Sequence, residues 1–253
     1  MRGMENILLF SLIVMRITGF IVFNPILGRR NAPAIVKMGI VMALSIIAVS
    51  YNGQAPVEAA NALEYSFLLL KEFFLGFVIG TVVNLFLNII VFAGESIDMQ
   101  MGLSMSKIFD ASSNAQLSLS ATFFNIVFIL LFFASDAHLA LIRMLLTSGE
   151  VVPYGSVIIT SGLSSAVLTV FCDCKALAVR MAMPMLAAEI LVEVGVGILM
   201  KTIPQINVFV VNIQAKIIFG LILLVFLFTP MAGFLDGVIE DMFKVLQEIL
   251  TLM

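Results

Sequence analysis

The sequence predicts an all-α, membrane-associated protein built of helical hairpins and of broken or short helices. Hydrophobic residues fill 62% of its 253 positions and charged residues only 11%. A soluble domain is about half apolar and about a quarter charged, so this chain has too few polar side chains to coat a water-soluble globule. The length fits a single domain spanning residues 1–253. The net charge of −3 does not indicate a nucleic-acid partner.

Apolar runs separated by polar or charged residues mark the expected helices. Only some runs contain the ~20 apolar residues that a helix needs to cross a bilayer. Because irregular backbone is tolerated at membrane depth only against protein or a wet cavity, the shorter runs are expected to pack on protein. The runs are 7–27, 38–51, 67–93, 117–134, 138–147, 157–171, 176–200 and 206–235, followed by an amphipathic tail, 236–253.

Signatures of enzymes and of metal or cofactor sites are missing from the sequence. It contains neither the P-loop pattern nor G-x-G-x-x-G, and its single histidine, His138, excludes a two-histidine zinc-protease motif. The segment 162–166 departs from the nucleophile-elbow pattern. Cys172 and Cys174 lack a nearby histidine and are expected to be reduced thiols in a loop. We therefore predict no enzyme, no metal and no cofactor.

A repeat of polar and small residues in the third run is typical of a close helix contact. Residues four apart share one slowly winding face of a helix. Glycines at G-x-x-x-G spacing let another backbone approach closely, and asparagines can hydrogen-bond across the contact. The pattern fits packing within the chain as well as a contact with another subunit. Its members are Glu72, Gly76, Gly80, Asn84 and Asn88.

Three of the charged residues inside the apolar runs, Arg16, Glu189 and Glu193, are expected to be buried. Glu189 and Glu193 share a helical face, and an ionised carboxylate at mid-bilayer costs about 2.5–3.5 kcal/mol on insertion scales. Both are therefore expected to face protein, water or each other. The alternative is a cation or proton site in an ion-coupled secondary transporter. Arg16 needs a partner of opposite charge, and either glutamate could serve.

The segment GESIDMQMGLSMSKIFDASSNAQ, residues 94–116, reads as a helix end followed by a polar loop. Glu95 and Asp98 share a helical face beside a cluster of methionines, and Ile108 and Phe109 form an apolar tip on the loop. Methionine fills irregular gaps, and hydrophobic constrictions stop ions by dewetting. From the residues alone, the segment is either an ordinary connection between helices or a compressible seal.

Several blocks of the sequence resemble a known family. They are RITGFIVFNPILGRRNAPAIVK, EFFLGFVIG, GESIDMQMGLSMS and MPMLAAEILVEVGVGILMKTIPQINVFVVN. In this order, from about residue 5 to 235, the chain resembles the flagellar biosynthetic protein FliR family, which has a counterpart in injectisome type III secretion. The resemblance implies a non-enzymatic export-gate subunit in the bacterial inner membrane, at the flagellar basal body.

The resemblance also implies partners and roles for particular residues. FliP-like and FliQ-like subunits would form a pseudo-helical assembly with this chain, near FlhA- and FlhB-like components, around a pore for unfolded export substrates. A plug loop, about 102–119, would close the pore. The obstructing residues would be Leu103, Met105, Ile108 and Phe109. The anchors and hinges of the loop would be Gly94, Glu95, Asp98 and Gly102.

Overall fold

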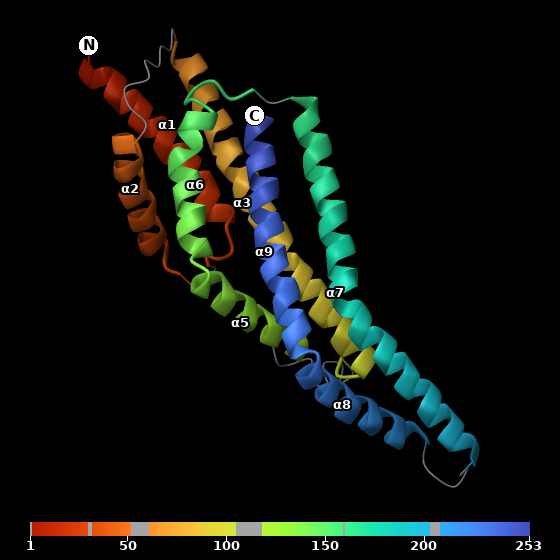
Figure 1. The fold of residues 1–253 in the computed structure, drawn as a ribbon. Helices are drawn as coiled ribbons and strands as arrows, with labels where there is room; N and C mark the ends of the chain where they lie inside the picture. The colour runs from red at the N-terminus through yellow and green to blue at the C-terminus, as the bar shows by residue number, and fades with distance from the viewer. Residues whose placement is uncertain (1, 30–31, 52–60, 105–117, 159, 203–207) are drawn as a thin grey trace. The chain divides into compact units, whose positions relative to one another are not determined.

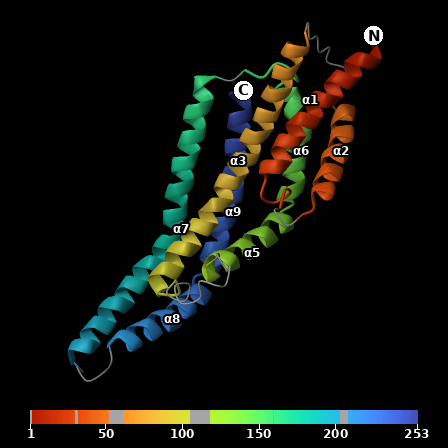
Figure 2. The same cartoon turned by 180° about the vertical axis from the view of Figure 1, so that it is seen from behind.

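The computed structural model describes residues 2–29, 32–51, 61–104, 118–158, 160–202 and 208–253. Within these ranges all regular structure is α-helical (Figures 1 and 2), which confirms the predicted fold class. The helices are α1 (Arg2–Phe23), α2 (Ala34–Tyr51), α3 (Ala62–Met101), α5 (Leu119–Ala134), α6 (Ala137–Val151), α7 (Ser161–Thr202), α8 (Val208–Phe226) and α9 (Phe228–Thr251).

Helices long and apolar enough to cross a membrane are present, as predicted. Among the described residues three qualify outright, in α2, α3 and α7. Two further pairs, α5 with α6 and α8 with α9, are broken at short interruptions, and up to five spans result if each pair crosses once. The break between α8 and α9 bends the chain by 62°. Pro230, in the first turn of α9, has no N–H and clashes with the carbonyl four residues earlier, which favours a break there.

One predicted break does not exist. The runs 157–171 and 176–200 are predicted to be separate helices with Cys172 and Cys174 in a loop, but α7 runs without interruption from Ser161 to Thr202 and includes both cysteines. The intervening Asp173 and Lys175 interrupt the apolar run without breaking the helix, because neither residue type is a strong helix breaker. The Lys175 ammonium lies 4.6 Å from the centre of the Phe92 ring.

The chain divides into two compact units. The first unit comprises residues 1–86, 135–172 and 239–253 and contains α1, α2, α6, the first parts of α3 and α7, and the C-terminal part of α9. Inside it, α2 packs against α1 and α6 (Figure 1). Buried side chains of α1, including Leu12, Ile13 and Phe20, form its core.

The second unit comprises residues 87–134 and 173–238. It contains α5, α8, the end of α3, most of α7 and the start of α9. Phe124, Phe128 and Phe132 recur every four residues on α5 and are fully buried. In contrast, Leu191 of α7 and Phe226 of α8 are 73% and 84% exposed. This unit therefore presents apolar side chains to its surroundings.

The amphipathic tail 236–253 is the C-terminal part of α9 rather than a separate element. Its apolar residues recur at the three- and four-residue spacing of one helical face. The buried residues of α9 are Met231, Leu235, Val238, Ile239, Met242, Leu246, Ile249 and Leu250.

Candidate functional site: buried charges and the base of a loop

Arg16 and Glu72 form a buried ion pair in the first unit. Arg16 Nε donates to Glu72 Oε2 at 2.6 Å, and neither side chain is exposed to solvent. The two remaining guanidinium nitrogens donate to Ser148 Oγ and to the Val152 carbonyl oxygen, both at 3.0 Å. Glu72 Oε1 accepts from the Gly155 N–H at 2.8 Å. Both charges are therefore paired and hydrogen-bonded, as burial requires.

Tyr154 completes this cluster. Its ring centre lies 4.1 Å from Arg16 Cζ, so the cation rests over an aromatic face. Burial raises the pKa of the Tyr154 phenol, although the Arg16 guanidinium opposes the rise. The predicted partners of Arg16, Glu189 or Glu193, were wrong, because the bonded carboxylate belongs to Glu72.

The Gly76/Gly80 pattern brings α3 against α1 within the chain. A Cβ at Gly76 would collide with the Arg16 carbonyl oxygen, and one at Gly80 would lie 2.8 Å from the Phe20 carbonyl oxygen. On the other side, Gly19 of α1 packs directly on the α3 backbone. Of the two interpretations left open by the sequence, packing within the chain therefore accounts for these glycines.

The two asparagines of the same repeat are not in this contact. Asn84 and Asn88 are both exposed in the chain. A four-residue step overshoots a 3.6-residue turn by about 40°, so successive members of the repeat rotate away from the face that holds Gly76. The repeat is thus a winding stripe of which only the first part packs against α1.

Asp98 holds the base of the loop that follows α3 in the second unit. Its buried carboxylate accepts from the Ser120 N–H, at 3.2 Å to Oδ1 and 3.4 Å to Oδ2. Its carbonyl oxygen accepts from the Ser104 N–H at 3.4 Å. Ser118 Oγ accepts from the Ala121 N–H at 3.0 Å and so caps the N-terminus of α5. Asp98 thus bonds both the segment that leaves α3, through Ser104, and the first turn of α5, through Ser120.

The other predicted anchors and hinges are placed differently. Glu95 is exposed. Gly94 lies inside α3, where a Cβ would collide with the Ala121 backbone, so it provides a close helix contact and not a hinge. Gly102 has a φ of +80°, a left-handed conformation that glycine adopts at little cost just after a helix. Leu103 is half-buried.

The remaining predicted plug residues, Met105, Ile108 and Phe109, lie outside the described residues.

Glu189 and Glu193 face α8 in the second unit. Glu193 Oε2 lies 3.0 Å from Lys216 Nζ. The Glu193 side chain is 51% exposed, so the prediction that it is buried is wrong, although the Lys216 side chain that it pairs with is only 14% exposed. Glu189 is 1% exposed, and neither carboxylate oxygen has a hydrogen-bond partner in the part of the chain that the structure describes.

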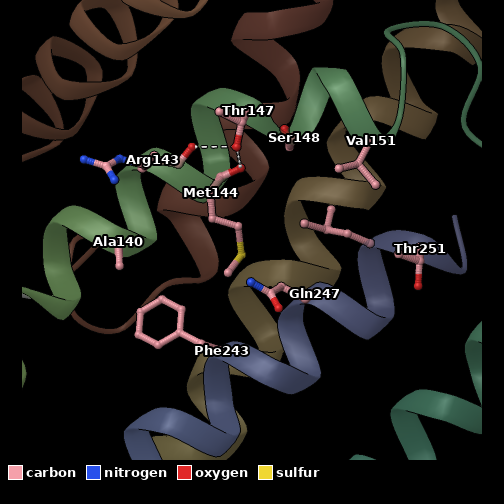
Figure 3. A pocket seen from close by; sticks show the side chains of 10 residues that line it. Ala140, Arg143, Met144, Thr147, Ser148, Val151, Phe243, Gln247 and Thr251 are labelled. Atoms are coloured by element: carbon pink, nitrogen blue, oxygen red, sulfur yellow. Dashed lines mark hydrogen bonds between the residues drawn. The ribbon is translucent and has the colours of Figure 1, made fainter.

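A groove between α6 and α9 of the first unit was not predicted (Figure 3). It encloses about 580 Å³. Met144 and Phe243 give it apolar walls, and the Thr147 hydroxyl is bonded to carbonyl oxygens of its own helix, Arg143 O at 3.0 Å. The amphipathic pattern of the tail was the available signal, but two separate segments must meet to form the groove. Its lining contains no carboxylate, histidine or cysteine to serve as a general acid, base or nucleophile.

Metal binding has no support in the described ranges, where no group of three or more His, Cys, Asp or Glu side chains could hold an ion. The helical fold and its long apolar helices define the class of the chain, an all-α membrane-associated protein with several candidate spans. The family described as "Bacterial export proteins, family 1" matches residues 7–242. The chain belongs to this family.

Relatives of the chain carry the name flagellar biosynthetic protein FliR. The protein of Bacillus subtilis is 29% identical over 219 residues, which cover 85% of this chain and 84% of the relative. That of Aquifex aeolicus is 26% identical over 243 residues, with 96% and 94% covered. That of Escherichia coli is 26% identical over 244 residues, with 94% and 91% covered. The chain is thus a FliR-family, membrane-associated component of the flagellar export apparatus.

Proposed function

We propose that this chain is a subunit of the flagellar type III export gate in the bacterial inner membrane. Together with FliP-like and FliQ-like partners it forms a central pore for unfolded export substrates, served by FlhA- and FlhB-like components. Its loop from about 102 to 119 keeps the pore closed. The chain contributes structure and a barrier to this gate and carries out no chemistry on the substrate.

The observation that carries the proposal is the bonding of Asp98. Its contacts to Ser104 and Ser120 hold together the two ends of the loop that the proposal assigns to the pore. A helix with its side chains is about 10–12 Å wide, so a passing substrate requires complete displacement of the loop.

The exposed apolar residues of the second unit support partners for this chain. Side chains such as Leu191, Ile198, Val225 and Phe226 are more than half exposed. Exposed apolar patches of this kind mark contacts with membrane or protein. In the proposed gate, FliP-like and FliQ-like subunits would cover part of this surface, with lipid covering the rest.

A second candidate function, an ion-coupled secondary transporter, is favoured by Glu189 alone. A buried carboxylate inside a candidate span is a feature of ion and proton pathways. A transporter would move its substrate in liposomes without partners, whereas a gate subunit would need them. Substrate movement by the chain alone that is lost in Glu189→Gln would favour the transporter, whereas a chain that moves nothing without its partners would exclude it.

The test of the gate is the conductance of the assembled complex. We expect deletion of residues 103–116 to leave the scaffold helices assembled and to open the pore to ions and small solutes. Replacement of the same residues by a Gly/Ser segment of equal length is the matched control for loop length, and it should also leak because the apolar side chains are gone. A wild-type complex that is already open, or a deletion complex that stays closed, would overturn the proposal.

A further inference from the structure

The buried face between α7 and α8 holds a carboxylate that the proposed gate does not use. On α7, Glu189 and Glu193 lie one turn apart on one face, and on α8 Lys216 and Gly220 do the same. Glu193 pairs with Lys216. Glu189 lies against Gly220, where an added Cβ would come within 2.7 Å of Glu189 Oε1. Helices α7 and α8 therefore run antiparallel here. Glu193 and Lys216 form an ion pair, whereas Glu189 lies against Gly220 without a hydrogen-bond partner among the described residues.

The surroundings of Glu189 suit a neutral carboxylic acid. The side chain is 1% exposed, and neither oxygen accepts or donates a hydrogen bond among the described residues. An ionised carboxylate buried without a partner is so unfavourable that the group takes up a proton instead. The protonated, neutral form of Glu189 avoids most of this free-energy cost of burial.

Met101, the last residue of α3, shares the space above Gly220 with Glu189. A Cβ at Gly220 would collide with Met101 Cε and would lie 2.8 Å from Met101 Cγ. Met101 is fully buried. Gly220 thus leaves room for two side chains, the carboxyl group of Glu189 and the thioether of Met101, at the point where α3 ends and Gly102 turns the chain.

We propose that Glu189 is a proton-binding residue whose charge determines whether Met101 is seated against α8. With the proton bound, Met101 covers the carboxyl group. When the proton passes to water, the carboxylate attracts Lys216 away from Glu193 and requires hydration, which it gains when Met101 leaves its place above Gly220. The link from Met101 to pore closure, through the loop that begins at Gly102, rests on the proposed function.

The charged groups around Glu189 are consistent with this exchange. In the part of the chain described, Lys216 of α8 and Glu193 of α7 are the charged groups that act on its carboxyl. Lys216 is 14% exposed on its side chain, so it lies within the contact and not in open solvent. From α3, the nearest carboxylate along the helix is Asp98, which is bonded to Ser120. Lys216 is therefore the cation available to an ionised Glu189.

Oxidation of methionine provides a direct readout in the native sequence. Hydrogen peroxide transfers one oxygen atom to an accessible thioether, and the sulfoxide is counted by peptide mass spectrometry. The full-length chain in its native membrane is treated with peroxide at pH values from about 5 to about 9. This range includes pKa values that have been recorded for buried glutamates in proteins. Met99 is 76% exposed and lies two residues from Met101, so its oxidation normalises the rate at each pH.

We expect the rate of Met101 oxidation, relative to that of Met99, to rise about tenfold across this pH range. This change corresponds to ~1.4 kcal/mol in the free-energy difference between the seated and the displaced position of Met101. Glu189→Gln, which is neutral at every pH, should keep Met101 protected throughout. Glu193→Gln is the matched control on the same face. It leaves Glu189 intact and frees Lys216, so the rise should remain and move to lower pH.

Met101 oxidation that does not change with pH in the wild-type chain would overturn the inference. A rise that persists unchanged in Glu189→Gln would overturn it as well. Conductance of the assembled complex, recorded over the same pH range, separates the inference from the proposed gate. A pH-dependent Met101 with a pH-independent pore would support proton binding at Glu189 and would count against the loop as the barrier.

Discussion

Arg16 of α1 and Glu72 of α3 lie 56 positions apart and meet in a 2.6 Å ion pair with no exposure of either side chain. The pair forms where the glycines of α3 bring the two backbones together, since Gly76 packs on the Arg16 carbonyl. A buried ion pair adds little net stability over apolar residues of the same shape, but an unpaired member is costly. The pair therefore fixes which faces of α1 and α3 meet.

Removal of one partner should destabilise the first unit strongly. We expect Glu72→Ala to cost about 3–5 kcal/mol, because the Arg16 charge would remain buried without its carboxylate. The Arg16→Met, Glu72→Met double variant should recover most of that loss. The measurement is denaturation of the purified chain in detergent. Disruption of the exposed pair of Lys244 with Asp241 is the control, expected within about 1 kcal/mol, and equal losses at both pairs would contradict the prediction.

Substitution of Gly76 by alanine should separate α1 from α3. The added Cβ meets backbone atoms of Arg16, which cannot move aside as a side chain can. We expect a loss of about 1–3 kcal/mol, the range seen for overpacked cores. Gly39→Ala in α2 is the matched control, since a Cβ there meets nothing within 4 Å and should stabilise its helix slightly. Thermal unfolding of both variants is the measurement. If both variants are stabilised, helix propensity alone accounts for the result and the close contact at Gly76 is contradicted.

Loss of the Asp98 carboxylate should loosen the start of α5. We expect Asp98→Ala to cost about 0.5–2 kcal/mol, the range for a lost side-chain acceptor at a helix N-terminus. Hydrogen exchange of the peptide that contains Ser120 should accelerate accordingly. Glu95→Ala, on the same helix but with an exposed side chain, should leave that exchange rate unchanged. If both variants exchange alike, Asp98 does not hold the loop base.

The stability of the first unit should fall at high pH because of Tyr154. Burial raises the pKa of its phenol above the ordinary value of 10.0, so the folded chain favours the neutral form. Once the pH exceeds the ordinary value, the unfolded chain ionises this residue first, and stability is lost as pH rises further. Tyr154→Phe keeps the ring near Arg16 and removes the ionisable group. Its unfolding free energy should therefore decline less between neutral and strongly alkaline pH than that of wild type.

The class of this protein follows from composition. With 62% hydrophobic residues, the chain cannot form a water-soluble globule, and its runs of apolar residues set the approximate positions of the helices. Most of the breaks predicted between these runs separate helices in the structure, but two positions differ. Hydropathy predicted an interruption at Asp173 and Lys175, where the helix continues, and missed the break before Phe228. A charged residue lowers the hydropathy of a segment without ending a helix, whereas a helix ends where its backbone hydrogen bonds are interrupted.

The sequence by itself also determined that Gly76 and Gly80 would admit a close neighbour, because spacing alone places them on one face. It did not determine the neighbour. A signal for the Arg16 partner was present, since Glu72 lies one turn before Gly76 on the same stripe. Only tertiary structure decided that α1 lies against that stripe and that Asp98 bonds the Ser120 N–H, 22 positions away. Local spacing fixes the face of a helix, but the pairing of faces depends on contacts between segments far apart in the chain.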